Sequence, residues 1–299
     1  MKKKITDKRD NEIEAIGIDL GTSQSAVSCF YTDGNLETIP IIQFLGESKI
    51  HEHMTLPSFL YYPRENELDG VTLPWHKEKD KTSKTFVAGL WSRKRSTELP
   101  SRGIASAKSW LCCSHIPRKD AILPWQSDIG EKVSPFFAIQ LYLEHIKEST
   151  LWQFKKRDVF LDFSKTDVII TVPASFDEVA RQLISEAAKN VGFIKLSLLE
   201  EPQAAFYSWT RDHEKDWRKQ VSKGELVLVC DVGGGTMDVA IFIEGNVWHT
   251  AVLPVGGNNI TADVSHGLRL PAAAAEEVKI AHGHACTQEV DSSEVFRVE

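Results

Sequence analysis

Short apolar runs separated by glycine-bearing turns dominate the hydrophobic pattern of this chain, and two of them are alike. Residues 16–20 and residues 226–230 are apolar runs of the length expected for buried strands. Each leads through a glycine-bearing turn into a further apolar run, and an aspartate, Asp19 or Asp231, stands at the strand's end. The pattern therefore predicts the same strand, turn and strand at two distant places in the chain.

The remaining pattern predicts a mixed α/β chain. Short runs around the first turn indicate an antiparallel meander. In residues 43–100 the clearest predicted strand is residues 56–62, and the rest is expected to be loops. Ser134 is typical of a helix start, and Asp177 is expected to cap a helix that connects two strands in a parallel βαβ crossover. The other expected strands are residues 167–172, 196–199, 226–231, 237–243 and 247–253, and the last helices are residues 260–267 and 272–282.

The two turns carry the chemistry of a phosphate site. Glycine lets the backbone bend sharply enough to aim N–H groups at an anionic oxygen, and neighbouring hydroxyls add donors. A carboxylate beside a phosphate would be repelled unless a divalent cation stood between them, so Asp19 and Asp231 imply Mg²⁺ held through water. The residues expected to bind phosphate are Gly21, Thr22, Ser23 and Gln24 in the first turn and Gly233, Gly234, Gly235 and Thr236 in the second.

Simpler interpretations of these turns exist. A glycine-rich hairpin after an aspartate is often only a turn, and that alternative stays open for residues 19–24 taken alone. Two such turns favour a phosphate clamp, because three consecutive glycines cost backbone entropy that a plain hairpin does not need. Neither a Gly-x-x-x-x-Gly-Lys-Ser/Thr stretch nor a Gly-x-Gly-x-x-Gly after a strand occurs, which excludes the P-loop and the dinucleotide-binding Rossmann motif.

Composition narrows the class of protein. The chain has 299 residues, of which 42% are hydrophobic and 26% charged, as in soluble globular proteins. A net charge of −7 argues against a nucleic-acid surface, and no run approaches the roughly 18 apolar residues of a membrane span. Five cysteines without Cys-x-x-Cys spacing indicate reduced thiols and a cytoplasmic location. The histidine pairs at residues 51/53 and 282/284 lack a second ligand pair, which disfavours zinc.

Together the motifs resemble the actin-like ATPase superfamily. Residues 18–22 (Ile-Asp-Leu-Gly-Thr), 171–176 (Thr-Val-Pro-Ala-Ser-Phe) and 200–205 (Glu-Glu-Pro-Gln-Ala-Ala) look like the nucleotide-binding domain of heat-shock seventy-class (DnaK-like) chaperones. Residues 107–112 (Ala-Lys-Ser-Trp-Leu-Cys) are similar to a divergent bacterial branch of that family. The resemblance implies an α/β, ribonuclease H-like fold with two lobes around a nucleotide cleft.

The resemblance also implies roles for single residues, with ATP or ADP and Mg²⁺ as ligands and slow ATP hydrolysis as the reaction. Lys108 would reach the γ-phosphate and orient water, and Glu201 would help to position that water or the metal shell. Pro173 and Arg181 would form a switch that relays the nucleotide state. The plain alternatives are that Lys108 is a surface lysine, that Glu201 only begins a helix and that Pro173 only ends a strand. The expected catalytic residues are Asp19, Lys108, Glu201 and Asp231, with Asp19 and Asp231 anchoring Mg²⁺.

From about residue 226 onward the sequence looks more like the cell-division ATPase FtsA. Both families share the phosphate clamp, and Gly257 would contribute a turn on the ribose side. No later Gly-Gly loop for adenosine follows, so a C-terminally incomplete fold is expected. The predicted parts are a disordered basic tail at residues 1–12, a first lobe at residues 13–165 and an incomplete second lobe, with the βαβ unit, at residues 166–299.

Four functions fit these expectations. The first is a chaperone-type ATPase domain that lacks a peptide-binding domain and meets unfolded clients or co-chaperones through a separate domain. The second is an actin-like assembly or cell-division scaffold whose polymerisation is controlled by nucleotide. The third is a sugar or acetate kinase, for which no acceptor-activating aspartate can be nominated, and the fourth is a degenerate, non-hydrolysing fragment. The sequence does not specify an oligomeric state.

Overall fold

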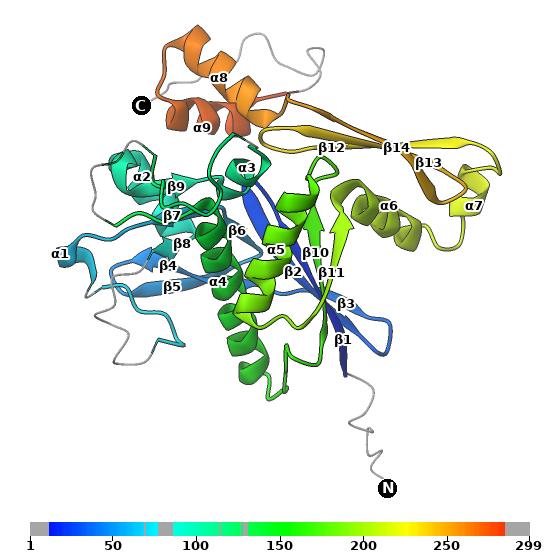
Figure 1. Cartoon of the computed structure of the whole chain (residues 1–299), viewed down its shortest axis with the longest axis horizontal. Helices are drawn as coiled ribbons and strands as arrows, with labels where there is room; N and C mark the ends of the chain where they lie inside the picture. Colours follow the sequence, from blue (N-terminus) through cyan, green and yellow to red (C-terminus); the bar gives the residue numbers. More distant parts are fainter. Residues whose placement is uncertain are drawn as a thin grey trace, which may run out of the picture.

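A computed structural model describes residues 12–68, 70–76, 86–113, 115–125, 127 and 131–284, and Figure 1 shows its arrangement. The predicted basic tail lies outside the described residues except for Glu12. Two separate sheets carry the two predicted turns. None of the described helices combines the length and apolar character needed to traverse a bilayer.

The first sheet has six strands in the order β11-β10-β1-β2-β3, with β6 also paired to β2. Strand β1 runs parallel to β10 and antiparallel to β2, and β10 runs parallel to β11. These strands are β1 (Ile13–Leu20), β2 (Gln24–Tyr31), β3 (Leu36–Thr38), β6 (Thr55–Pro57), β10 (Asp167–Val172) and β11 (Lys195–Glu200).

Helices α4 (Pro135–Lys156) and α5 (Glu178–Val191) cover one face of this sheet (Figure 1) and complete the main hydrophobic core. Both predicted helix starts are confirmed. The Ser134 hydroxyl accepts a hydrogen bond from the Phe137 amide at 3.0 Å, and an Asp177 carboxylate oxygen accepts one from the Ala180 amide at 2.7 Å. Such caps satisfy amide groups that the first helical turn leaves without partners.

Residues 43–100 contain more regular structure than the expected loops. Strand β7 lies within residues 56–62, the clearest strand in the hydrophobic pattern of this region. The other strands are two to six residues long: β4 and β5 form a short hairpin, and β8 pairs with β7, so their apolar runs are too short to stand out from loops. The elements on this side are β4 (Ile41–Gly46), β5 (Lys49–His53), β7 (Phe59–Tyr61), α1 (Glu65–Leu68), β8 (Val87–Ala88), α2 (Leu90–Glu98), β9 (Gly103–Ala105) and α3 (Ala107–Cys112).

The second sheet is an antiparallel meander of β12 (Leu226–Val232), β13 (Met237–Ile243) and β14 (Asn246–Leu253). Helix α6 (Glu201–Asp212) packs on one face of it, where Phe206 stacks on Phe242 with ring centroids 4.5 Å apart. The chain continues through α7 (Trp217–Gln220), α8 (Gly257–Leu268) and α9 (Ala272–His282), and the last two helices confirm the predicted ones.

Two expectations need correction. The βαβ unit, assigned from sequence to the second lobe, belongs by strand pairing to the first sheet, because β10 pairs with β1 along five residues. Residues 226–230 are a strand, as predicted, but not a buried one: Leu226 and Leu228 are each 61% exposed. Only one face of β12 is covered by α6, so its alternate side chains face solvent.

Candidate active site

The two glycine turns lie against each other. Ser23 belongs to the turn between β1 and β2, and Gly234 belongs to the turn between β12 and β13. A Cβ atom added to Gly234 would overlap the Ser23 hydroxyl, so glycine at this position permits the close approach. Gly235 has no described atom within 4 Å of its Cβ position and faces open space. The sequence motifs thus meet at one place in the structure.

The first turn is held in shape by the strands behind it. Ser58 donates from its hydroxyl to the Gly21 carbonyl at 2.7 Å and from its amide to the Ser23 carbonyl at 2.9 Å. The side chain of Gln24 accepts a hydrogen bond from the Thr55 hydroxyl at 2.5 Å, so it points to β6. A side chain at Gly21 would collide with the backbone of Gln24. Thr22 is half-buried and Ser23 exposed, which leaves hydroxyl donors at the tip.

The predicted acidic residues stand at the ends of the paired strands. Asp19 is the last residue but one of β1, lies opposite Thr171 of β10, and accepts a hydrogen bond from the Thr171 hydroxyl at 2.7 Å. Asp231 pairs in register with Asp238 of β13. Burial raises the pKa of Asp231, the charges of Asp19 and Asp238 raise it further, and Lys108 opposes them. The carboxylates of Asp19, Asp231 and Asp238 and the ammonium group of Lys108 therefore interact electrostatically at this site.

Lys108 and Glu201 form a buried ion pair. The ammonium Nζ of Lys108, a residue only 3% exposed, donates to Oε1 of Glu201 and lies 5.9 Å from the Phe176 ring centroid. Burial raises the pKa of the Glu201 carboxyl, and Lys108 counteracts that rise. Helix α3 carries Lys108 into the site after Ser106, whose φ of 52° starts the helix with a sharp turn. Lys108 is therefore a buried residue, and the alternative that it is merely a surface lysine does not hold.

Asp238 is an acidic residue to which the sequence assigned no role. It is 2% exposed, and its Oδ2 accepts a hydrogen bond from the Thr236 hydroxyl at 3.2 Å. Burial raises the pKa of Asp238, while Thr236, Lys108 and the backbone amides of Ala174 and Ser175 lower it. The carboxylate therefore joins the second turn to the segment that follows β10. Its place as the last residue of the Asp-x-Gly-Gly-Gly-Thr-x-Asp motif was the available signal.

Pro173 and Arg181 connect the site to the outer end of the first sheet. Pro173 is buried directly after β10, and its carbonyl accepts a hydrogen bond from the Phe176 amide at 3.1 Å. Arg181 of α5 donates from Nε to the Phe176 carbonyl at 3.2 Å and from Nη2 to Oε1 of Glu200 at 2.7 Å. Glu200 immediately precedes Glu201. The two predicted switch residues therefore contact one segment, next to the Lys108 ion pair.

Gly257 begins α8 beside the second turn. Its amide donates to the Gly233 carbonyl at 3.0 Å, and the next amide, of Asn258, donates to the Gly234 carbonyl at 2.6 Å. A Cβ on Gly256 would lie 2.6 Å from the Gly233 carbonyl oxygen, so this glycine is needed for the contact. Gly233 itself donates to the Thr236 carbonyl at 2.8 Å, which closes the turn.

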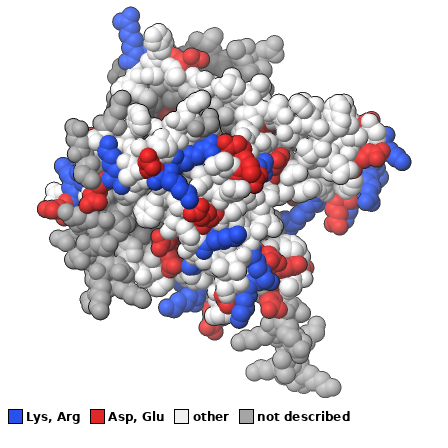
Figure 2. Space-filling model, viewed as in Figure 1, with Lys and Arg blue, Asp and Glu red and all other residues white. Residues whose placement is uncertain are grey.

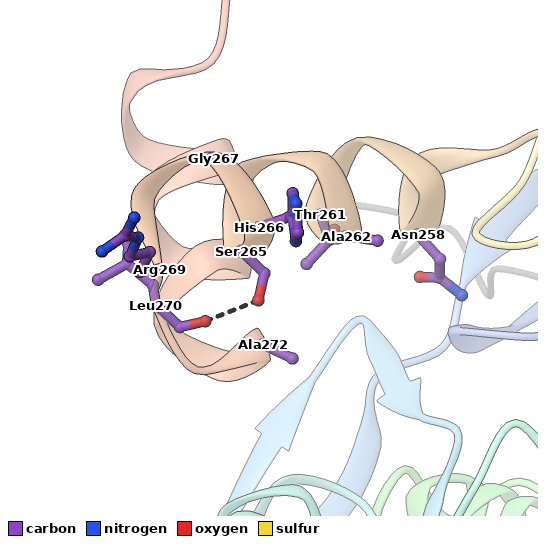
Figure 3. A pocket seen from close by; sticks show the side chains of 9 residues that line it. All are labelled: Asn258, Thr261, Ala262, Ser265, His266, Gly267, Arg269, Leu270 and Ala272. Carbon is purple, nitrogen blue, oxygen red and sulfur yellow. Dashed lines mark hydrogen bonds between the residues drawn. The ribbon is translucent and has the colours of Figure 1, made fainter.

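A polar cluster and a cavity adjoin this end of α8. Lys279 of α9 donates to the Thr261 hydroxyl at 2.8 Å and lies 2.6 Å from the Glu276 carboxylate. A cavity of about 850 Å³ runs along α8 from Asn258 to Arg269 (Figure 3). Sequence reasoning missed these residues, because they converge only when α9 folds back on α8. The cavity is lined by Asn258, Thr261, Ala262, Ser265, His266, Gly267, Arg269, Leu270 and Ala272.

The residues present fit a hydrated divalent cation bound with a phosphate. Within the described part of the chain, no three His, Cys, Asp or Glu side chains are grouped to ligate one ion directly. Asp19, Asp231 and Asp238 nevertheless interact strongly enough for Asp19 and Asp238 to raise the pKa of Asp231. A cation would relieve that repulsion, and carboxylate oxygens with water are the ligand set that Mg²⁺ prefers.

Comparison with known proteins identifies the family. The family model "Hsp70 protein" matches residues 15–249. The chain belongs to the Hsp70 family. A second family model, "Cell division protein FtsA", matches residues 228–299, which confirms the resemblance expected for the C-terminal part. Both matches support the actin-like ATPase fold, and the Hsp70 match supports, at the level of the family, a nucleotide-binding domain of chaperone type.

Individual relatives show the same division. A "Chaperone protein HscA homolog" of Shewanella loihica is 30% identical over 262 residues, covering 85% of this Hsp70-family chain and 36% of the relative. "Chaperone protein DnaK" of Thermotoga neapolitana is 26% identical over 90% of this chain and 37% of its own length. "Cell division protein FtsA" of Pseudomonas aeruginosa is 34% identical over 119 residues, 40% of this chain and 27% of the relative. The chain thus spans between about a quarter and two fifths of these relatives.

Proposed function

We propose that this Hsp70-family chain binds ATP with Mg²⁺ and hydrolyses it slowly. The observation that carries the proposal is the convergence of Asp19, Asp231, Lys108 and Glu201 beside the contact between Ser23 and Gly234. Phosphoryl transfer to water requires positioning and charge neutralisation rather than covalent chemistry by the protein. A lysine, several carboxylates and backbone N–H groups in glycine turns supply both.

The two turns would hold the phosphates from opposite sides. Backbone amides and hydroxyls at residues 21–24 and 233–236 would donate to phosphate oxygens, and Asp19 and Asp231 would hold the water shell of Mg²⁺, which neutralises phosphate charge when bound. The cavity beside Asn258 is of a size that accommodates the rest of a nucleotide. Gly257 and the cluster around Lys279 would lie on its ribose side.

Lys108 and Glu201 would act on the reacting groups. Lys108 would turn from Glu201 to a γ-phosphate oxygen and orient the attacking water. Glu201 and Asp238 would then accept hydrogen bonds from that water, since burial raises the pKa of both carboxyls and makes them better proton acceptors. Pro173 and Arg181 would respond to this rearrangement through Glu200, which neighbours Glu201. This response is the proposed switch.

Single-turnover hydrolysis tests the catalytic assignment. We expect Asp231→Asn and Lys108→Ala to reduce the rate by a factor on the order of 100, as loss of a major electrostatic contact does in other enzymes. Lys119→Ala is the matched control, because Lys119 pairs with Glu186 on the surface and is 55% exposed. Rates unchanged in Asp231→Asn and Lys108→Ala would refute the assignment. Hydrolysis that proceeds without an added phosphoryl acceptor would argue against the alternative of a sugar or acetate kinase.

Calorimetry with ADP and Mg²⁺ tests binding separately from hydrolysis. Measurable affinity that falls in Asp19→Asn is expected, and absence of binding would favour the degenerate alternative. We further propose a cytoplasmic location, because the four described cysteines are free and the HscA and DnaK relatives are chaperones. Unfolded proteins or co-chaperones would be met through a domain beyond the one described.

A second candidate function is nucleotide-controlled assembly of the kind expected of a division scaffold. The match of residues 228–299 to the FtsA family favours it, because α8, α9 and the second turn all lie in that stretch. Sedimentation with and without ATP tests it. Large polymers that require ATP would support it, and a sedimentation coefficient independent of ATP would count against it.

A further inference from the structure

Two histidines lie side by side on strand β5. His51 and His53 are two residues apart on this strand, and alternate residues of a strand share one face. Their imidazole rings are in contact, with centroids 4.6 Å apart and ring planes inclined by 46°. The side chain of His51 is exposed and that of His53 is half-buried, so the pair is accessible from solvent.

Backbone pairing holds the two histidines on a fixed support. His51 lies opposite Gln43 of β4, and His53 lies opposite Ile41. Both partners are buried, and Figure 1 shows β4 and β5 beside α4, which packs against β4. The spacing of the two rings is therefore set by a regular element, which positions ligands more precisely than a loop does.

A hydrogen bond fixes the tautomer of His51. Its Nδ1 lies 2.8 Å from the backbone carbonyl oxygen of Glu52. A carbonyl oxygen only accepts hydrogen bonds, so Nδ1 carries the proton and Nε2 keeps its lone pair. Histidines that bind metal ions commonly donate their other ring N–H to a backbone carbonyl in this way. The contact therefore gives His51 the protonation pattern of a metal ligand.

The charged neighbours of the pair are already matched. Lys49, on the same face of β5, pairs with Glu47 at 3.1 Å, and Lys156 of α4 pairs with Glu52 at 2.8 Å. Figure 2 shows acidic and basic side chains interspersed over the face it draws, without a large patch of one sign. Binding of a cation by the histidine pair therefore depends on the imidazole nitrogens and not on a general negative field.

We propose that His51 and His53 bind a divalent transition-metal ion that takes ligands at right angles, such as Ni²⁺ or Cu²⁺, with water completing its shell. A metal ion lies about 2 Å from an imidazole nitrogen and so about 3.2 Å from the ring centroid. Centroids 4.6 Å apart then subtend roughly 90° at the ion, the angle between neighbouring ligands in square-planar and octahedral shells. Structural zinc sites need about 109° and four protein ligands, so the argument that disfavours zinc does not apply to these ions.

Isothermal titration with NiCl₂ at about pH 7.5, where imidazole is mostly neutral, tests the site. The proposal does not depend on nucleotide binding. The untagged chain should bind Ni²⁺ in excess Mg²⁺, because Mg²⁺ competes for carboxylates but not for imidazoles. His51→Ala and His53→Ala should each weaken this binding at least about tenfold, since loss of an outer-shell partner alone costs about 10–100-fold. Circular dichroism checks that each variant is folded.

The other His-x-His pair provides the matched control. His282 is the last residue of α9 and His284 lies beyond it, so no strand sets their spacing. The double variant His282→Ala with His284→Ala should therefore leave the Ni²⁺ affinity of the β5 site unchanged. An equal loss of affinity in this variant and in His51→Ala would overturn the proposal, as would a parent chain that does not bind Ni²⁺.

Chemical modification gives a second readout on the parent chain. Diethyl pyrocarbonate reacts with the unprotonated nitrogen of imidazole, which a bound metal ion occupies. Ni²⁺ should therefore protect His51 and His53, whereas His249, an exposed residue of β14, should keep reacting. Mass spectrometry of the modified peptides measures the protection. Equal modification of His51 and His53 with and without Ni²⁺, or Ni²⁺ binding that is retained in both His51→Ala and His53→Ala, would overturn the proposal.

Discussion

The ammonium group of Lys108 and the carboxylate of Glu201 form an ion pair that joins α3 to the first residue of α6. The Lys108 side chain is 4% and the Glu201 side chain 15% exposed, so the pair is largely removed from water. Breaking such a pair from one side leaves an uncompensated buried charge, which costs far more than breaking an exposed pair. The ion pair therefore has a structural role as well as the proposed catalytic one.

We predict that Lys108→Ala lowers the free energy of unfolding by about 3 kcal/mol, because it strands the Glu201 carboxylate. Urea denaturation at neutral pH measures the effect. Lys119→Ala, which breaks an exposed pair with Glu186, should cost less than about 1 kcal/mol. Equal effects of the two substitutions would show that Lys108 is solvated in solution.

The clustered carboxylates predict a pH dependence of stability without Mg²⁺. Burial and the neighbouring charges raise the pKa of Asp231 above its unfolded value, and burial does the same for Asp238. A raised carboxyl pKa means that the folded state binds the proton more tightly, so stability from these groups is present at low pH and is lost as pH rises through the folded pKa.

Asp231→Asn should therefore reduce the loss of stability between about pH 4 and pH 7 in chelator-treated protein. Urea denaturation across this range measures the slope, and Asp212→Asn, at an exposed position on α6, is the control. Adding Mg²⁺ and ADP should stabilise the parent chain more than Asp231→Asn. A slope that is the same in Asp231→Asn and the parent would contradict the interpretation of these carboxylates as a repelling cluster.

The contact between the two turns could be predicted from the sequence, because the same arrangement of a strand, an aspartate and a glycine turn occurs twice. Asp19 and Asp231 each end an apolar run before glycine, and a single phosphorylated ligand is the simplest reason for the repetition. Helix starts at Ser134 and Asp177 were equally readable, since capping is a local interaction between residues close in sequence.

Other features depend on contacts between distant segments and leave no local signal. The pairing of β10 with β1 decides to which sheet the βαβ unit belongs, and hydrophobic pattern alone does not choose between sheets. Burial of Asp238 depends on the segment after β10, and the Lys279 cluster depends on the fold of α9 against α8. The exposure of Leu228 was mispredicted because an apolar run indicates side chains suited to burial, but not whether one of the described elements packs on them.

Gly256 and Gly235 provide a matched pair for the packing at the second turn. A Cβ on Gly256 would lie 2.6 Å from the Gly233 carbonyl oxygen and 2.8 Å from Gly234, both rigid backbone, whereas one on Gly235 would meet no described atom within 4 Å. Gly256→Ala should lower the free energy of unfolding by about 1–3 kcal/mol through overpacking, and Gly235→Ala should change it little. Thermal unfolding measures both, and comparable losses would mean that the contact with α8 does not form.

Asp177 predicts the acid sensitivity of α5. Its carboxylate accepts hydrogen bonds from both terminal nitrogens of Arg118, at 3.0 and 2.8 Å, and from the Ala180 amide. The Arg118 hydrogen bond and then the Ala180 amide lower the pKa of Asp177, so its stabilisation is present above the unfolded pKa and is lost as pH falls through the folded one. Asp177→Ala should cost about 1–2 kcal/mol at pH 7 and less below about pH 4, when the parent is protonated too. Urea denaturation at both pH values measures this difference, and Glu178→Ala, at the neighbouring exposed position, is the control. A loss of unfolding free energy in Asp177→Ala that does not depend on pH would show that the capping carboxylate is not charged.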